Sequence, residues 1–133
     1  MQALDDRLID QLRQRLDERA AALREEIRSL ESERADGASA GAAREVTDAG
    51  EQGEQRIRDA VRVAEAGRDH DELRQVDAAL ERIGRGRYGE CVDCGEDIAP
   101  TRLSAQPWAA RCIGCQERWE QAHPASVRIP SLP

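Results

Sequence analysis

The sequence predicts a mostly α-helical fold, in which a long antiparallel coiled-coil hairpin precedes a small four-cysteine zinc finger with a short C-terminal helix. Three observations predict it. Apolar residues recur at helical spacing over most of the first 84 positions, a Gly-Arg-Gly sequence ends this pattern, and four cysteines follow as two Cys-x-x-Cys pairs. We expect the hairpin at 1–84 with its tip near 36–53, the finger and C-terminal helix at 85–123, and an extended tail at 124–133.

The first predicted helix contains a heptad repeat of apolar residues. The repeat consists of Ile9, Leu16, Leu23 and Leu30, and Leu12 and Ile27 lie near the complementary seam positions. Arginine and glutamate occupy much of the remaining surface, as on a coiled-coil helix. We expect this helix to end at about Arg34, before a connector of small residues at 36–41.

The second predicted helix begins near Asp48. Asp48 followed three residues later by Glu51 matches an N-cap with its capping-box partner. Gly84-Arg85-Gly86 provides the C-terminal stop. The apolar stripe between these signals consists of Ile57, Val61, Ala64, Leu73, Val76, Leu80 and Ile83. Two long helices with a short connector should pair as an antiparallel hairpin.

The four cysteines predict a structural zinc site. Cys91-x-x-Cys94 and Cys112-x-x-Cys115 are separated by seventeen residues, within the range of two-knuckle zinc sites. Four thiolates complete a tetrahedron, so the predicted Zn²⁺ has no open position for catalysis. The alternatives are a redox dithiol pair or accidental spacing. His70 and His123 are expected at the surface, and Trp108 and Trp119 are expected to pack a small zinc core.

Composition narrows the possible functions. The net charge of −7 argues against nonspecific binding to duplex DNA, which requires a basic surface. No apolar run is long enough for a membrane span, and the acidic N-terminus does not resemble a signal peptide. We therefore expect a cytoplasmic protein, in whose reducing environment the cysteines are metal ligands and not disulfides.

The cysteine region and the helices before it resemble the DksA/TraR family of bacterial transcription regulators. The resemblance lies in the aromatic-Gly-x-Cys entry at Tyr88–Cys91 and in an Arg-Leu-x-Ala-x-Pro sequence that starts at Arg102 and ends at Pro107. The finger accounts for about a third of the chain, and the hairpin extends the likeness to most of it. The long first helix is similar to the longer, DksA-type members of the family.

The resemblance implies a function through RNA polymerase. Such proteins insert their coiled coil into the secondary channel of the polymerase and bring an acidic tip near the catalytic centre. An ungapped register from Cys91 places Asp48 and Glu51 at the two acidic tip positions, with glutamate in place of the family's second aspartate. Gly53 replaces the alanine of that motif. Capping of the helix alone is the alternative role for the two acids.

The same register bears on ppGpp, the alarmone with which the family acts. It retains Arg68 at the polymerase and alarmone interface, but it places Gln75, Gln106 and Gln116 where basic side chains are found in DksA. A pyrophosphate site depends on charge-assisted hydrogen bonds. We therefore expect weak or absent synergy with ppGpp.

Other classes of function remain as alternatives. A scaffold would use the hairpin to pair with another coiled coil while zinc stapled its base, and a dimer in solution would favour it over the expected monomer. A nucleic-acid-binding zinc module would use Arg82, Arg85 and Arg87, against the acidic net charge. No nucleophile–base pair is evident, so an enzyme is not expected.

Overall fold

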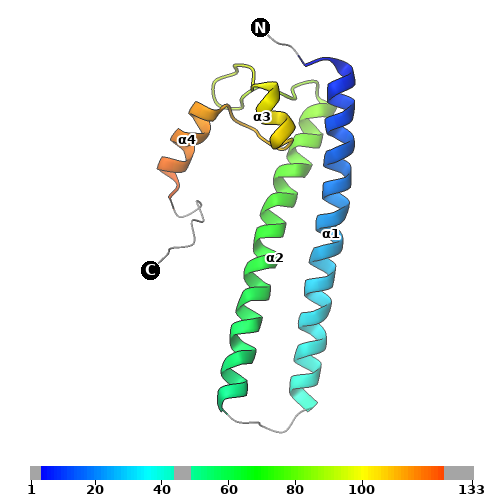
Figure 1. Cartoon of the computed structure of the whole chain (residues 1–133), viewed down its shortest axis with the longest axis vertical. Helices are drawn as coiled ribbons and strands as arrows, with labels where there is room; N and C mark the ends of the chain where they lie inside the picture. Colours follow the sequence, from blue (N-terminus) through cyan, green and yellow to red (C-terminus); the bar gives the residue numbers. More distant parts are fainter. Residues whose placement is uncertain (1–3, 44–48, 125–133) are drawn as a thin grey trace. The chain divides into compact units, whose positions relative to one another are not determined.

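The computed structural model describes residues 4–43 and 49–124, and within them the side chains of 4–33 and 50–124. These residues form four helices, labelled in Figure 1: α1 (Asp6–Ala43), α2 (Ala49–Gly84), α3 (Pro100–Ala105) and α4 (Ile113–Ala122). Within the described ranges, pairing of extended backbone is limited to one antiparallel bridge between Glu90 and Asp97. The mostly α-helical fold class is therefore confirmed, and none of these helices is apolar enough over a sufficient length to cross a bilayer.

The chain divides into two compact units. One consists of Met1–Leu16 together with Ala78–Pro133, and the other is Asp17–Asp77. The two long helices thus contribute to both units, with α1 supplying its first turns and α2 its last turns to the unit that contains the cysteines. The division into hairpin, finger and tail remains a prediction, and the tail from 125 onward lies outside the described residues.

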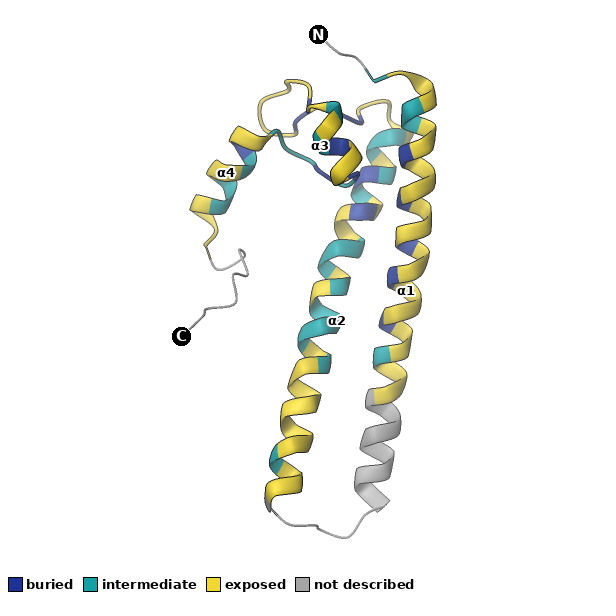
Figure 2. Ribbon diagram, in the orientation of Figure 1, coloured by how far each residue is buried: buried dark blue, intermediate teal, exposed yellow. Residues whose placement is uncertain are grey.

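In the unit of residues 17–77, α1 and α2 lie side by side and antiparallel (Figure 1). Ala20, Leu23 and Ile27 of α1 and Val76 of α2 are buried between more exposed neighbours. Because these α1 positions are three or four residues apart, they form one stripe of the helix, as the heptad pattern predicts. Figure 2 shows this stripe as recurring dark bands along α1.

Ion pairs between the two helices flank this seam. The guanidinium of Arg24 lies 2.9 Å from the carboxylate of Asp77, and Arg19 pairs with Glu72. Nearer the other end, the corresponding distance between Arg62 and Glu33 is 3.7 Å. Exposed ion pairs contribute little free energy individually. The pairs Arg24–Asp77 and Glu33–Arg62 run in opposite directions along the two helices, which agrees with their antiparallel arrangement. His70 is exposed, as predicted, and its Nε2 lies 3.7 Å from Glu31.

The predicted end of the first helix is wrong. Helix α1 continues nine residues beyond Arg34 to Ala43, so the predicted connector at 36–41 is helical. Gly37 and Gly41 each cost about 1 kcal/mol relative to alanine in a helix, but alanine is the best helix former and four of the last six residues of α1 are alanine. Small residues without proline therefore do not stop this helix. Helix α2 begins at Ala49, and the predicted cap Asp48 lies outside the described residues.

The predicted apolar stripe of α2 is only partly correct. Val76 is buried and Leu73, Leu80 and Ile83 are half-buried, but Ile57 and Val61 are 66% and 48% exposed. The first half of α2 is mostly exposed in Figure 2. The heptad positions that precede Val76 in steps of seven are occupied by charged Asp69 and Arg62, so the apolar seam of α2 does not extend through this half.

In the unit that contains the cysteines, α2 ends in a Schellman motif. The N–H of Arg87 donates to the carbonyl of Arg82, the N–H of Gly86 donates to that of Ile83, and Gly86 has a left-handed φ of 73°. The predicted stop at Gly84–Gly86 is therefore confirmed. The same unit contains a small core. Its buried members include Leu12, Leu16, Ala79, Tyr88, Ile98, Leu103 and Ala109.

The helix α3 was not predicted. It has proline at its first position, a placement that favours helix initiation because proline lacks only an N–H that would be unpaired there. Its Leu103 is fully buried, and the carbonyl of Ser104 accepts a 2.7 Å hydrogen bond from Arg15 of α1. Helix α3 lies between the two cysteine pairs in the sequence, so this hydrogen bond connects that segment to α1.

Candidate metal centre

The first cysteine pair is held by a tight backbone turn. The N–H of Gly95 donates to the carbonyl of Cys91, and the N–H of Cys91 donates to the carbonyl of Glu96, at 2.9 and 2.8 Å. Gly95 has a φ of +76°, a left-handed conformation that L-residues with side chains rarely adopt. The turn directs the thiols of Cys91 and Cys94 to the same side.

The second pair lies at the start of α4. Cys112 is the N-cap of this helix, and its sulfur accepts a hydrogen bond from the N–H of Cys115 at 3.5 Å. A residue that caps a helix meets unpaired N–H groups and the positive end of the helix dipole, both of which stabilise a thiolate. The N–H of Val92 donates to the carbonyl of Ala110 at 2.9 Å, which brings the two pairs together.

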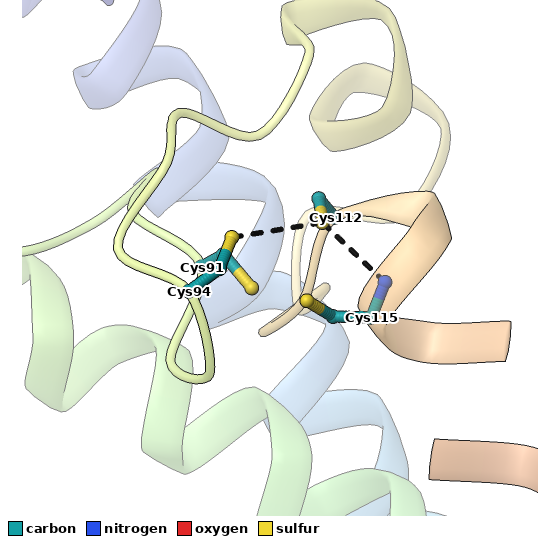
Figure 3. A group of neighbouring side chains, drawn as sticks. All are labelled: Cys91, Cys94, Cys112 and Cys115. Atoms are coloured by element: carbon teal, nitrogen blue, oxygen red, sulfur yellow. Dashed lines mark hydrogen bonds between the residues drawn. The ribbon is translucent and has the colours of Figure 1, made fainter. Parts of the chain in front are cut away.

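Figure 3 shows the four cysteines around a common centre, and their sulfur atoms all lie within 4.8 Å of one another. The Sγ atoms of Cys94 and Cys112 are 3.9 Å apart. Tetrahedral Zn²⁺ with Zn–S bonds of about 2.3 Å requires sulfur atoms about 3.8 Å apart. The arrangement therefore fits Zn²⁺ with four thiolate ligands, as predicted from the spacing. The backbone elements that form the cluster are a turn and a helix N-terminus.

The ionisation of these thiols shows why a cation is needed. Burial opposes the charged form of Cys91, but backbone hydrogen bonds from Cys112, Cys94 and Asp93 lower its pKa to about 6. A backbone hydrogen bond from Glu96 favours the Cys94 thiolate, yet desolvation and the neighbouring sulfurs raise its pKa to about 12. The Cys91 thiolate therefore forms readily, whereas the Cys94 thiolate is opposed. A divalent cation removes that opposition by balancing the negative charge.

Arg111 connects the parts of the finger around the cluster. Its Nε donates to the carboxylate of Asp93 in the first turn at 2.7 Å, and its guanidinium carbon lies 5.2 Å from the centre of the Trp119 ring. The Arg111 carbonyl accepts a 2.9 Å hydrogen bond from Arg102 of α3. Arg111 thus links the first cysteine turn, α3 and α4.

The aromatic residues lie around this framework. Tyr88 is buried, and its hydroxyl donates to the carbonyl of Pro107 at 2.8 Å. Trp108 and Trp119 are half-buried in the same unit, which agrees with their predicted packing role. His123 is the exposed C-cap of α4 and its ring stacks on Trp119 at 4.3 Å, so it lies at the predicted helix end. It is not among the clustered ligands.

The sequence-based comparison identifies this segment. Residues 86–121 match the prokaryotic dksA/traR C4-type zinc finger. In this segment the chain is similar to the DksA/TraR family. A C4-type zinc finger whose four cysteines cluster closely enough to hold one metal ion confirms the predicted cofactor.

Relatives and solved structures extend the likeness. The chain is 41% identical over 49 residues to the RNA polymerase-binding transcription factor DksA of Caulobacter vibrioides. That match covers 37% of this chain and 34% of the Caulobacter protein. The chain spans 34% to 56% of the length of the first curated relatives it matches, so the strong sequence similarity concerns the finger.

The structural comparison covers the helices as well. The transcription factor DksA2 from Pseudomonas aeruginosa is similar with a TM-score of 0.72 and 28% identity, over 90% of this chain and 88% of that one. Chlamydia trachomatis has an RNA polymerase binding protein and transcriptional regulator, Dks, whose structure is similar with a TM-score of 0.57. That likeness is at 26% identity and covers 90% and 95% of the two chains. At 90% coverage of this chain, both structural likenesses extend over the long helices as well as the finger segment.

The other predicted site residues lie away from the cysteines in sequence. Glu51 is exposed in the first turn of α2, Arg68 is exposed in the middle of that helix, and Asp48 lies outside the described residues. Their roles remain predictions. Sequence reasoning missed Arg118, whose guanidinium contacts Cys115. The signal was available, because residues three apart in a helix lie on the same face.

Proposed function

We propose that this protein regulates transcription by binding RNA polymerase and inserting the tip of its α1–α2 hairpin into the secondary channel. The observation that carries the proposal is the likeness to DksA2, which includes the long helices as well as the finger. A helix of 38 residues, such as α1, is about 57 Å long. Such a length suits insertion of a narrow helical pair into a channel.

The zinc centre supports a structural role within this function. Four thiolates fill the coordination sphere of Zn²⁺, which leaves no position for a bound water or substrate. Two of these ligands are buried, and the backbone around them is fixed by short hydrogen bonds. We propose that the finger holds the hairpin helices at their open end, where α1 begins and α2 ends, and that regulation depends on the tip at the opposite end.

The acidic residues at the start of α2 are the proposed acting groups. Glu51 is exposed in the first turn, where the helix dipole stabilises a carboxylate. Asp48 precedes it by three residues. We propose that these two acids act on the polymerase centre, and that their contribution to helix capping is compatible with that action.

Binding and regulation can be measured separately. Zinc-loaded wild-type protein and an Asp48→Asn/Glu51→Gln variant would be compared for binding to RNA polymerase core from the same organism, then for transcription from a ribosomal promoter. The isosteric changes remove both charges and preserve side-chain size. We expect both proteins to bind and the variant to lose most of the regulation.

A matched control removes two negative charges elsewhere. Asp17→Asn/Glu117→Gln alters two exposed acids, one on α1 and one on α4, and should leave regulation unchanged. Equal loss of regulation in the control would contradict the proposed role of the tip. Failure of the wild-type protein to bind the polymerase, together with a stable dimer in solution, would favour the coiled-coil scaffold instead.

A further inference from the structure

Arg118 lies beside the zinc ligands without being one of them. It is on α4, one helical turn after Cys115, and its guanidinium Nη2 donates to the Cys115 Sγ at 3.1 Å. Cys115 is itself 4% exposed, so its sulfur is largely shielded from water. The contact therefore supplies the sulfur with a charged hydrogen-bond donor in place of solvent.

The charge of the centre makes such a donor significant. Four thiolates and one Zn²⁺ carry a net charge of about −2. Arg111 is also near, but its guanidinium is directed to the Asp93 carboxylate and the Trp119 ring. Among the described residues, Arg118 is the arginine with a direct hydrogen bond to a cysteine sulfur.

We propose that Arg118 is a positioning residue of the metal centre, which orients the Cys115 thiolate and offsets part of the negative charge so that zinc is released slowly. Outer groups that donate to metal ligands commonly change metal affinity by about 10- to 100-fold. The contact also joins a ligand to the next turn of the same helix. Release of Cys115 from the metal therefore requires this hydrogen bond to break.

The hydrogen-bond donors of the other cysteines explain why the Cys115 sulfur needs a donor of its own. The Cys112 sulfur already accepts the backbone N–H of Cys115, and Cys91 lies in a turn with several backbone donors. Cys115 has the Arg118 guanidinium as its donor in the structure. The guanidinium thus does for Cys115 what backbone N–H groups do for Cys91 and Cys112.

The test is metal transfer to a chromophoric chelator in excess, measured for the full-length zinc protein. Arg118→Gln preserves the high helix propensity of this position and removes the charge. Arg118→Lys keeps the charge but lacks the planar fork. Arg87→Gln is the control, because it removes one exposed positive charge from the same unit outside the cysteine cluster. We expect about tenfold faster transfer for Arg118→Gln, an intermediate rate for Arg118→Lys and the wild-type rate for Arg87→Gln.

A second readout distinguishes a role of Arg118 in positioning the Cys115 thiolate from a general loosening of α4. In the cobalt-substituted proteins, thiolate-to-metal charge-transfer bands report on the sulfur environment. We expect these bands to shift in Arg118→Gln and to remain unchanged in Arg87→Gln. Wild-type transfer rates in Arg118→Gln would overturn the proposal, and so would faster transfer with unshifted bands. Neither readout involves RNA polymerase, so the result is independent of the proposed function.

Discussion

At Gly89 the backbone of the finger passes too close to a neighbouring side chain for a β-carbon to fit without movement. A β-carbon there would lie 2.6 Å from Cδ1 of Leu4, and the residue has a φ of +89°. Its carbonyl accepts a 2.7 Å hydrogen bond from Ile98, whose side chain is buried. One residue therefore combines a left-handed backbone with a close contact to the start of the chain.

Gly89→Ala should lower the free energy of unfolding of the zinc-loaded protein by about 2 kcal/mol, because alanine is strained at this φ and its β-carbon would meet Leu4. Gly86→Ala is the matched comparison, since Gly86 also has a left-handed φ but open space around it. We expect it to cost about 1 kcal/mol. Urea unfolding followed by tryptophan fluorescence measures both.

The contribution of Leu4 can be isolated with a double-mutant cycle. Leu4→Ala should cost less in the Gly89→Ala background than in the wild type, because the smaller side chain relieves the clash. Equal costs for Gly86→Ala and Gly89→Ala, with additive effects in the cycle, would show that the close approach of Leu4 contributes nothing.

At the scale of the helices, α1 and α2 contribute unequally to the apolar seam between them. Apolar residues of α1 are buried from Leu12 to Ile27, whereas the buried residues of α2 are confined to Val76 and Ala79 among its described side chains. Asp69 lies seven residues before Val76, and its Oδ2 is buried without a hydrogen-bond partner in the described structure. A buried polar atom of this kind costs about 1–3 kcal/mol.

Asp69→Ala should therefore stabilise the hairpin by about 1–2 kcal/mol, because it removes the unpaired oxygen and improves helix propensity. Asp59→Ala gives the same gain in propensity on the same helix, but Asp59 is exposed and pairs with Arg62. The control should change stability by less than the Asp69 variant. Thermal unfolding followed by circular dichroism compares them, and a lower melting temperature for Asp69→Ala would contradict the prediction.

The helices also show where sequence reasoning succeeds and where it does not. Leu16 and Leu23 are buried as the heptad predicts, because a repeated apolar spacing has one consistent solution on a helix. Ile57 and Val61 belong to the predicted apolar stripe of α2, but they are exposed. Burial depends on what the facing segment offers, and local spacing contains no such information. The end of α1 was mispredicted for a related reason, since glycines among alanines weaken a helix without stopping it.

The zinc centre was more predictable than the contacts around it. Cys-x-x-Cys spacing restricts two ligands to one turn, so Cys91, Cys94, Cys112 and Cys115 could be paired from sequence. The contacts of Arg111 with Asp93 and Trp119 depend on the orientation of α4, which no motif encodes. The contact of Arg118 with Cys115 lies within α4, and only its i,i+3 spacing could have indicated it. The capping role of Cys112 was equally hidden, because cysteine is not among the usual N-cap residues.

For the whole molecule, we predict a weak response to ppGpp, because the register of the family resemblance places glutamine where basic residues are expected. Gln106 is exposed, and the side-chain amide of Gln116 donates to Glu120 at 3.1 Å, so neither offers a positive charge. We expect regulation by the wild-type protein to change little when the alarmone is added to a transcription reaction. A Gln106→Arg/Gln116→Arg variant should respond more strongly, because arginine forms charge-assisted hydrogen bonds with phosphates. Strong synergy in the wild-type protein would contradict this prediction.

Removal of zinc should affect the unit that contains the cysteines more than the unit of residues 17–77. The two tryptophans of the sequence, Trp108 and Trp119, both lie in the unit that contains the cysteines, so tryptophan emission reports on that unit. Without the metal, the four sulfurs cannot all be thiolates at close range. The small core around Ile98 and Leu103 then loses the metal that holds the two cysteine pairs together.

We therefore expect a chelator to shift the tryptophan emission to longer wavelength while most far-ultraviolet circular dichroism remains. The helical signal comes mainly from α1 and α2, with 38 and 36 residues, and the unit of residues 17–77 has its own buried stripe and ion pairs. Added Zn²⁺ should restore the emission. Complete loss of zinc with unchanged emission would show that the finger core is stable without its metal, and loss of most helical signal would show that the hairpin depends on it.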